Sequence, residues 1–231
     1  MEPDLKNQRA RLIVEAMLTA QSMSRAVSAC ASTGCAGSGG QERRPRALGN
    51  PLGDISAHFN PAMTLAFALR GDMGWVMTGV SWAVQFGAAD LGSLLARAFF
   101  GVPGNLAATM PPPGRSWQAA GFEAILTFGL VLMVLNLADG PKLNGPLVPL
   151  AVGAYIMAWG TMGGPFEGAS MNPARSFGPD LARGDLSTWW VYLVSPVVGA
   201  VVAVGTARVL RGPPTAQEAS AAVGTPLDRS A

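Results

Sequence analysis

Two copies of one tripeptide constrain what this chain can fold into: Asn60-Pro61-Ala62 and Asn172-Pro173-Ala174. Asn is a favoured N-cap residue, and Pro suits the first helical position because the N–H that it lacks has no partner there in any helix. Each tripeptide therefore predicts a helix start. The first helix is expected to end near Arg70, and Pro179 and Gly184 are expected to keep the second one short.

Helices of this length are too short to cross a membrane. About ten residues span ~15 Å, whereas the hydrocarbon core of a bilayer is ~30 Å thick. The composition nevertheless favours a membrane protein: mean hydropathy is +0.30, 13% of the residues are charged, and 29 glycines allow close helix packing in lipid. We therefore expect an all-α membrane protein in which two half-helices meet tip to tip.

Charge and motifs argue against other classes of protein. The net charge of +2 is too small and too dispersed to indicate nucleic-acid binding. Cys30 and Cys35 have no neighbouring His or Asp, so we expect ordinary thiols, no metal site and no cofactor. The sequence shows neither a nucleophile beside a base nor a phosphate-binding loop, so an enzyme is not expected.

An internal repeat relates the two halves of the chain. Residues 14–19 and 122–127 share the pattern Glu-Ala-x-Leu-Thr, which begins at Glu15 and at Glu123. Each copy precedes one Asn-Pro-Ala tripeptide, so the chain is interpreted as a duplicated unit of helix, helix, half-helix and helix. Three full crossings per unit force the second unit to be inverted relative to the first.

These features resemble the aquaporin, or major intrinsic protein, family. The resemblance rests on both Asn-Pro-Ala boxes with their flanks, on Glu15 and Glu123, and on Pro196-Val197-Val198-Gly199 near the end of the chain. Gly178-Pro179-Asp180-Leu181 points to bacterial-type members. The resemblance implies an aquaporin-like inverted repeat with two re-entrant half-helices.

Apolar stretches and polar ends give the expected organisation of such a protein. Residues 1–11 form a polar, cytoplasmic N-terminus, residues 12–210 a channel domain, and residues 211–231 a disordered tail. Good spans are expected at 75–100, 117–138, 146–163 and 189–210, and a weaker one at 12–20.

Residues 12–51 depart from the pattern of the family. The family places the rest of the first helix, a loop and the whole second helix between positions like Glu15 and Asn60, whereas this interval is rich in Ser, Gly and Arg. Basic residues at both ends of the chain require an even number of crossings, but the spans counted above make five. We interpret the first half as incomplete through a deletion, a frameshift or degeneration; a five-span pore is the less favoured alternative.

The resemblance implies a passive transmembrane channel for water first and small neutral solutes second. Both Asn side chains would donate hydrogen bonds to passing solutes, and the two helix dipoles would repel cations and interrupt a chain of protons. Arg175 would form a constriction together with Gly160 and Ala169. Water-selective members usually carry a His at the position of Gly160, so a glycerol or small-solute facilitator is the alternative.

Scaffold roles and partners follow from the same resemblance. Glu15 and Glu123 would accept backbone N–H groups of the re-entrant loops, and His58 would be a hydrogen-bond donor beside the first box. The expected setting is a homotetramer in the lipid bilayer of the plasma membrane, with both termini cytoplasmic. Two competing classes stay open: a secondary transporter, which also uses half-helices that meet at the midplane, and a non-conducting remnant.

Overall fold

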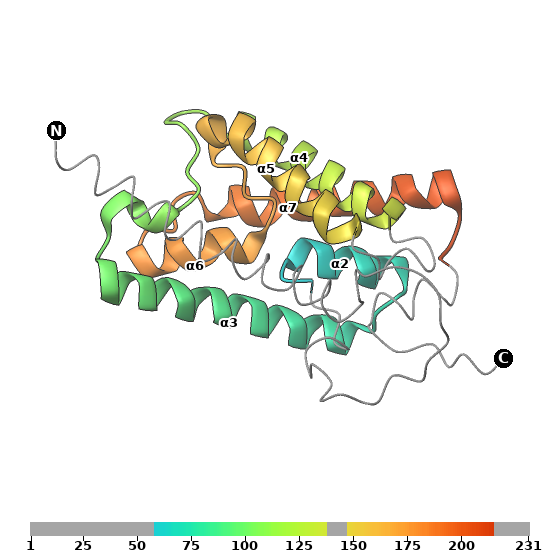
Figure 1. Cartoon of the computed structure of the whole chain (residues 1–231), viewed down its shortest axis with the longest axis horizontal. Helices are drawn as coiled ribbons and strands as arrows, with labels where there is room; N and C mark the ends of the chain where they lie inside the picture. Colours follow the sequence, from blue (N-terminus) through green and yellow to red (C-terminus); the bar gives the residue numbers. More distant parts are fainter. Residues whose placement is uncertain (1–57, 138–146, 215–231) are drawn as a thin grey trace, which may run out of the picture.

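The described part of the chain consists of α-helices and one short 3-10 helix (Figure 1). The computed structural model describes residues 58–137 and 147–214, and no strand occurs within these two ranges. The predicted all-α fold is thus confirmed. The elements are α2 (Pro61–Arg70), α3 (Trp75–Phe100), η1 (Pro103–Ala107), α4 (Ser116–Leu137), α5 (Leu147–Glu167), α6 (Pro173–Arg183) and α7 (Trp189–Arg211).

The two short helices lie between long ones. In Figure 1, α3 runs along one side, α4, α5 and α7 form the other, and α2 and α6 follow one another in between. α4 packs on α7, α6 on α3, and α2 on α7. Each short helix is therefore supported by a long helix while its first residue points toward the other short helix.

The short helices begin and end for local reasons. α2 has 10 residues and α6 has 11, and each is followed by a glycine with a left-handed φ, 99° at Gly71 and 79° at Gly184. The prediction that Pro179 would help to end the second helix is wrong, because Pro179 lies inside α6. One proline removes a single N–H donor, and the packing of α6 against α3 keeps the remaining turns helical.

The four long helices are long enough to cross a bilayer. They have 26, 22, 21 and 23 residues, and a rise of ~1.5 Å per residue makes each at least about 30 Å long. α4 and α7 also reach a mean hydropathy of 1.9, so they are candidate spans by composition too. The spans predicted at 75–100, 117–138 and 189–210 agree with α3, α4 and α7 to within one residue, whereas α5 continues past residue 163 to Glu167.

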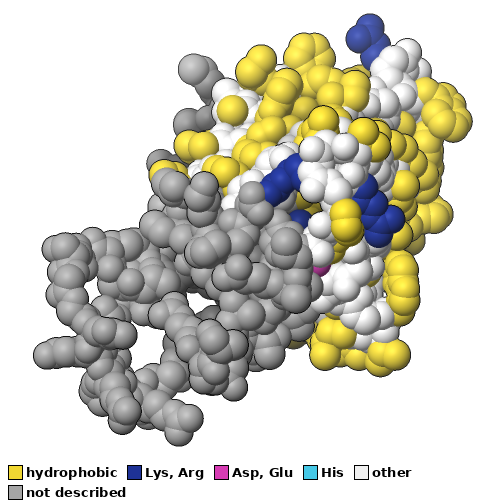
Figure 2. Space-filling model, turned by 90° about the vertical axis from the view of Figure 1, so that its right-hand side faces the viewer, with side chains coloured by type: hydrophobic (Ala, Val, Ile, Leu, Met, Phe, Trp, Pro, Cys, Tyr) yellow, Lys and Arg dark blue, Asp and Glu magenta, His cyan; other side chains and the backbone are white. Residues whose placement is uncertain are grey.

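The outer surface of these helices is largely apolar. On α3, Val76 is 85% exposed and Phe99 is 77% exposed. Figure 2 shows hydrophobic side chains over much of the described surface, and Lys or Arg side chains gather at the end of the molecule that faces the viewer. An exposed apolar surface of this extent suits contact with lipid. The weaker span predicted at 12–20 lies outside the described residues.

The contact between α4 and α7 depends on a glycine. The buried residues at this contact include Leu126 and Val131 of α4 and Ala200 and Ala203 of α7. A Cβ atom at Gly199 would lie 2.4 Å from the carbonyl oxygen of Ala124 and 2.8 Å from the backbone nitrogen of Phe128. The two backbones therefore approach closely at this point, as membrane helices do at small residues.

We predict that Gly199→Ala destabilises the protein by about 1–3 kcal/mol, because the new methyl group would overlap backbone atoms that cannot move independently. Thermal unfolding in detergent, followed by circular dichroism, measures the effect as a lower Tm. Gly205→Ala is the matched control on the same helix, since a Cβ there meets nothing within 4 Å. Equal Tm values for the two variants would contradict the prediction.

Candidate functional site

The N-termini of α2 and α6 form the centre of the candidate site. Asn60 and Asn172 are the N-cap residues, both with extended backbones, and each is followed by a proline at the first helical position. Asn60 Oδ1 accepts the N–H of Ala62 at 2.9 Å, and Asn172 Oδ1 accepts the N–H of Ala174 at 3.2 Å. The two side-chain oxygens therefore satisfy helix donors that have no partner within the helix.

The side-chain amides of the same two residues cross to the opposite loop. Asn60 Nδ2 donates to the carbonyl oxygen of Met171 at 2.7 Å, and Asn172 Nδ2 donates to that of Phe59 at 2.9 Å. Phe59 and Met171 each precede an Asn, and both have a left-handed φ, of 49° and 53°. The structure thus brings the two Asn-Pro-Ala boxes together in a reciprocal arrangement, and each amide keeps a second hydrogen for another acceptor.

A polar network around Thr64 of α2 supports the first box, and Gln85 of α3 is part of it. Thr64 Oγ1 donates to the carbonyl oxygen of Asn60 at 3.1 Å and accepts from Gln85 Nε2 at 2.9 Å. His58 Nδ1 lies 3.4 Å from the same hydroxyl, and its ring stacks on that of Phe67. Since the one hydroxyl hydrogen of Thr64 is used toward Asn60, His58 fits here as a donor rather than an acceptor.

Carboxyl groups hold the loop before the second box. Glu123 of α4 is completely buried, and its two carboxylate oxygens accept the N–H groups of Ser170, at 3.0 Å, and of Met171. Glu167, the last residue of α5, accepts the N–H of Ala169 at 2.9 Å, and Tyr192 of α7 donates to the carbonyl oxygen of Glu167. Three consecutive N–H groups of this irregular segment therefore end on carboxyl groups.

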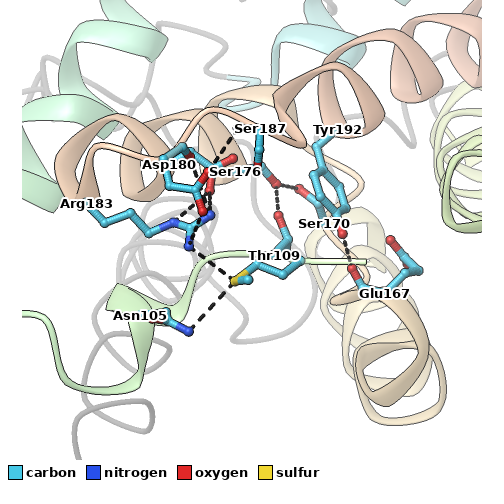
Figure 3. A network of polar contacts seen from close by, with 11 residues as sticks. Asn105, Thr109, Glu167, Ser170, Ser176, Asp180, Arg183, Ser187 and Tyr192 are labelled. Atoms are coloured by element: carbon cyan, nitrogen blue, oxygen red, sulfur yellow. Dashed lines mark hydrogen bonds and ion pairs between the residues drawn. The ribbon is translucent and has the colours of Figure 1, made fainter. Parts of the chain in front are cut away.

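A chain of hydroxyl groups connects the same loop to the segment before α4 (Figure 3). Thr109 Oγ1 hydrogen-bonds to Ser176 Oγ, which donates to Ser170 Oγ at 2.5 Å. Ser170 Oγ in turn donates to the carbonyl oxygen of Asn172 at 2.9 Å. Hydrogen bonds thus connect the loop before the second box to Ser176 of α6, to Thr109 in the segment 101–115 and to Glu123 of α4.

Arginines cover the outer ends of both half-helices. Arg208 of α7 donates to the carbonyl oxygen of Leu69 near the C-terminus of α2, and Arg97 of α3 donates to that of Ala182 near the C-terminus of α6. These ends carry the negative poles of the helix dipoles. Cations therefore compensate the two negative poles, while the two positive poles face each other at the Asn residues.

The three residues expected to form a constriction lie on different elements. Gly160 is on α5, where a Cβ would meet nothing within 4 Å; Ala169 is buried in the loop before the second box, with a left-handed φ of 45°. Arg175 is half-buried in the first turn of α6, and its N–H approaches Asn172 Oδ1 at 3.4 Å. Glu15 lies outside the described residues.

Sequence reasoning missed several supporting residues. The sequence does not predict a role for Glu167 or for the hydroxyl of Thr109. It also does not predict the hydrogen bond from Tyr192 to Glu167. A carboxylic acid at the end of an apolar stretch, directly before the flank of the second box, was the available sign for Glu167. Thr109 gave no sign at all, because its partner Ser176 is distant in the sequence.

Comparison with known proteins adds independent evidence. The sequence model of the major intrinsic protein family matches residues 47–206. The chain is 42% identical over 166 residues to Aquaporin NIP1-1 of Zea mays, covering 69% of this chain and 57% of that protein. It is 36% identical over 166 residues to Nodulin-26 of Glycine max, covering 69% of this chain and 59% of that protein.

The fold has a counterpart among solved structures. The X-ray structure of the aquaglyceroporin from Plasmodium falciparum superposes with a TM-score of 0.58 and 25% identity, covering 67% of this chain and 73% of that one. The likeness to bacterial-type members stays a prediction, since the relatives named here come from plants and from Plasmodium. The chain spans less than three fifths of the length of both plant relatives. With a family model that matches more than half of its residues, this chain belongs to the major intrinsic protein family.

Proposed function

We propose that this chain is a passive transmembrane channel for water and small neutral solutes. The observation that carries the proposal is the reciprocal pair of bonds from Asn60 to Met171 and from Asn172 to Phe59. These bonds point both amides in fixed directions at the junction of α2 and α6. A solute oxygen that passes the junction would find two preoriented donors.

The charges of the half-helices account for ion exclusion. A helix N-terminus carries roughly +0.5 elementary charge, so the junction of α2 and α6 repels cations and turns water with its oxygen toward the Asn pair. Adjacent waters then point their hydrogens away from the junction, which interrupts proton transfer along the file. Aquaporin-type pores in general exclude protons and cations with an Arg and with half-helix dipoles. In this chain Asn60, Asn172 and Arg175 would have these roles.

The residues of the proposed constriction are compatible with two classes of solute, water and small neutral molecules such as glycerol. Arg175 would face Gly160 and Ala169, whose small side chains leave a wide and weakly polar opening. The open space at Gly160 and the likeness to an aquaglyceroporin favour glycerol as a second solute. By the family resemblance, Ser176 and Tyr192 are typical of water channels, because glycerol channels usually carry Asp after the Arg, whereas Leu193 is typical of glycerol channels.

Family membership sets the proposed context. The major intrinsic proteins are multi-pass membrane channels, and the relative from Zea mays is named an aquaporin. We place this chain in the plasma membrane, as a homotetramer with both termini in the cytoplasm. Arg208 and Arg211 at the end of α7 agree with that orientation.

We predict that vesicles containing the chain shrink faster than empty vesicles in a stopped-flow osmotic test, and that Asn172→Asp reduces the added permeability by about tenfold. The substitution replaces the amide that donates to Phe59 by a carboxylate, so it removes one amide-to-carbonyl hydrogen bond and places a negative charge beside that carbonyl oxygen. Asn136→Asp, at an exposed position on α4, is the control with the same change of charge. Equal rates for the wild type and empty vesicles would leave only a non-conducting remnant, and saturable, sodium-dependent flux would indicate a transporter.

We predict that Gly160→His lowers glycerol permeability more than water permeability, by roughly tenfold in their ratio, because an imidazole narrows the opening opposite Arg175 and adds polar groups. A His side chain can be accommodated, since the space beside Gly160 is open. Gly153→His on the same helix, also at an open position, is the control. An unchanged ratio would remove Gly160 from the proposed constriction.

A further inference from the structure

Met110 lies between η1 and α4, and its sulfur atom meets two polar side chains (Figure 3). Arg183 Nη1, at the end of α6, donates to Met110 Sδ at 3.3 Å, and Asn105 Nδ2 of η1 donates to the same atom at 3.8 Å. A thioether sulfur is only a weak hydrogen-bond acceptor. Two donors, one of them charged, therefore converge on an atom that forms only weak bonds with either.

The other partners of the Arg183 guanidinium are oxygen atoms. Nε and Nη2 donate to Asp180 Oδ1 at 3.3 and 3.1 Å, and Nη2 also donates to the carbonyl oxygen of Asp185 at 3.4 Å. Nη1 lies 3.2 Å from Asp185 Oδ2. The side chain of Arg183 is only 7% exposed, so these contacts fix its position, and the contact with Met110 is the weakest among them. An oxygen atom bound to the sulfur of Met110 would therefore meet a fixed, charged donor.

Met110 is also accessible from water. It is 42% exposed and lies outside the long helices, at the end of the molecule opposite the C-terminus of α7 (Figure 1). Met157 and Met162 are more exposed, but they lie on the outer face of α5, which is apolar and suits lipid. A dissolved oxidant therefore reaches Met110 more easily than it reaches these two residues in a bilayer.

We propose that Met110 is a modification site, at which a peroxide dissolved in water forms a sulfoxide whose oxygen accepts hydrogen bonds from Arg183 and Asn105. With hydrogen peroxide, the sulfur attacks one oxygen, an S–O bond forms and the O–O bond breaks. The sulfur loses two electrons to the peroxide. The second oxygen leaves as water and takes the proton of the transferred oxygen.

The sulfoxide strengthens an existing contact between two segments. Its polar oxygen is a better acceptor than the thioether, so the bond to Arg183 becomes charge-assisted and joins the 101–115 segment more firmly to α6. Thr109, the residue before Met110, already hydrogen-bonds to Ser176 of α6. The modification therefore acts beside the hydroxyl chain that reaches the second box. This inference does not depend on the proposed channel function.

Oxidation mapping tests the site. The protein in lipid vesicles is treated with dilute hydrogen peroxide, and peptide mass spectrometry measures the rate of sulfoxide formation at each methionine. Met110 is expected to react faster than Met157 and Met162. Asn105→Asp is expected to slow the reaction of Met110 by about fivefold, because a carboxylate repels the incoming oxygen instead of donating to it. Asp tolerates the left-handed φ of 53° at this position.

A charge-matched variant is the control for this measurement. Asn136→Asp, at an exposed position on α4, makes the same change of charge away from Met110 and is expected to leave its rate unchanged. A rate at Met110 no higher than that at Met162, or an equal rate in wild type and Asn105→Asp, would overturn the proposal.

Thermal unfolding tests the strengthened contact. Wild type and Met110→Leu are treated with peroxide in vesicles and extracted into detergent, and the change in Tm caused by the treatment is measured for each. All other methionines are the same in both proteins, so the difference between the two changes reports Met110. The change for wild type is expected to lie about 2–4 °C above that for Met110→Leu. Equal changes would overturn the proposal, because the sulfoxide would then gain no bond from Arg183.

Discussion

The structure depends on satisfying irregular backbone in the middle of an apolar molecule. Two helices begin inside the described fold, and the segments before them cannot pair their N–H and C=O groups within a helix. In a bilayer no solvent would take over these bonds, so side chains must. Asn60 and Asn172 do this reciprocally, since each caps its own helix through Oδ1 and binds the opposite loop through Nδ2.

The reciprocal bonds also explain the electrostatics of the junction. Two positive helix ends that face each other repel, and the crossing amide-to-carbonyl bonds are part of what keeps them together. Arg97 and Arg208, from two long helices in opposite halves of the chain, compensate the outer negative ends. The positive poles at the junction therefore act on whatever passes between them, which is the physical basis of the proposed selectivity against cations.

The two loops are supported differently. The loop before α2 is held by hydrogen bonds of the hydroxyl of Thr64 and the amide of Gln85. The loop before α6 is held by the buried carboxyl groups of Glu123 and Glu167, which accept its N–H groups. The carboxyl groups hold Ala169, Ser170 and Met171, so they decide the shape of the segment proposed to select solutes. Selectivity in this chain is therefore expected to depend on residues that never touch the solute.

The sequence by itself determined the local features. Each half-helix begins at an Asn-Pro pair and ends before a glycine, Gly71 or Gly184. Both signals can be read from the sequence, because helix capping and a left-handed φ depend on the type of a single residue. Apolar runs gave α3, α4 and α7 to within one residue, and the repeat around Glu123 indicated a carboxylate for a loop. Only the tertiary structure decided which N–H groups that carboxylate takes, that Glu167 stands beside it, and that Thr109 and Tyr192 reach the same loop. These contacts join α4, α5, α6 and α7, and a hydrophobic pattern carries no information on which distant partner a buried polar group will meet.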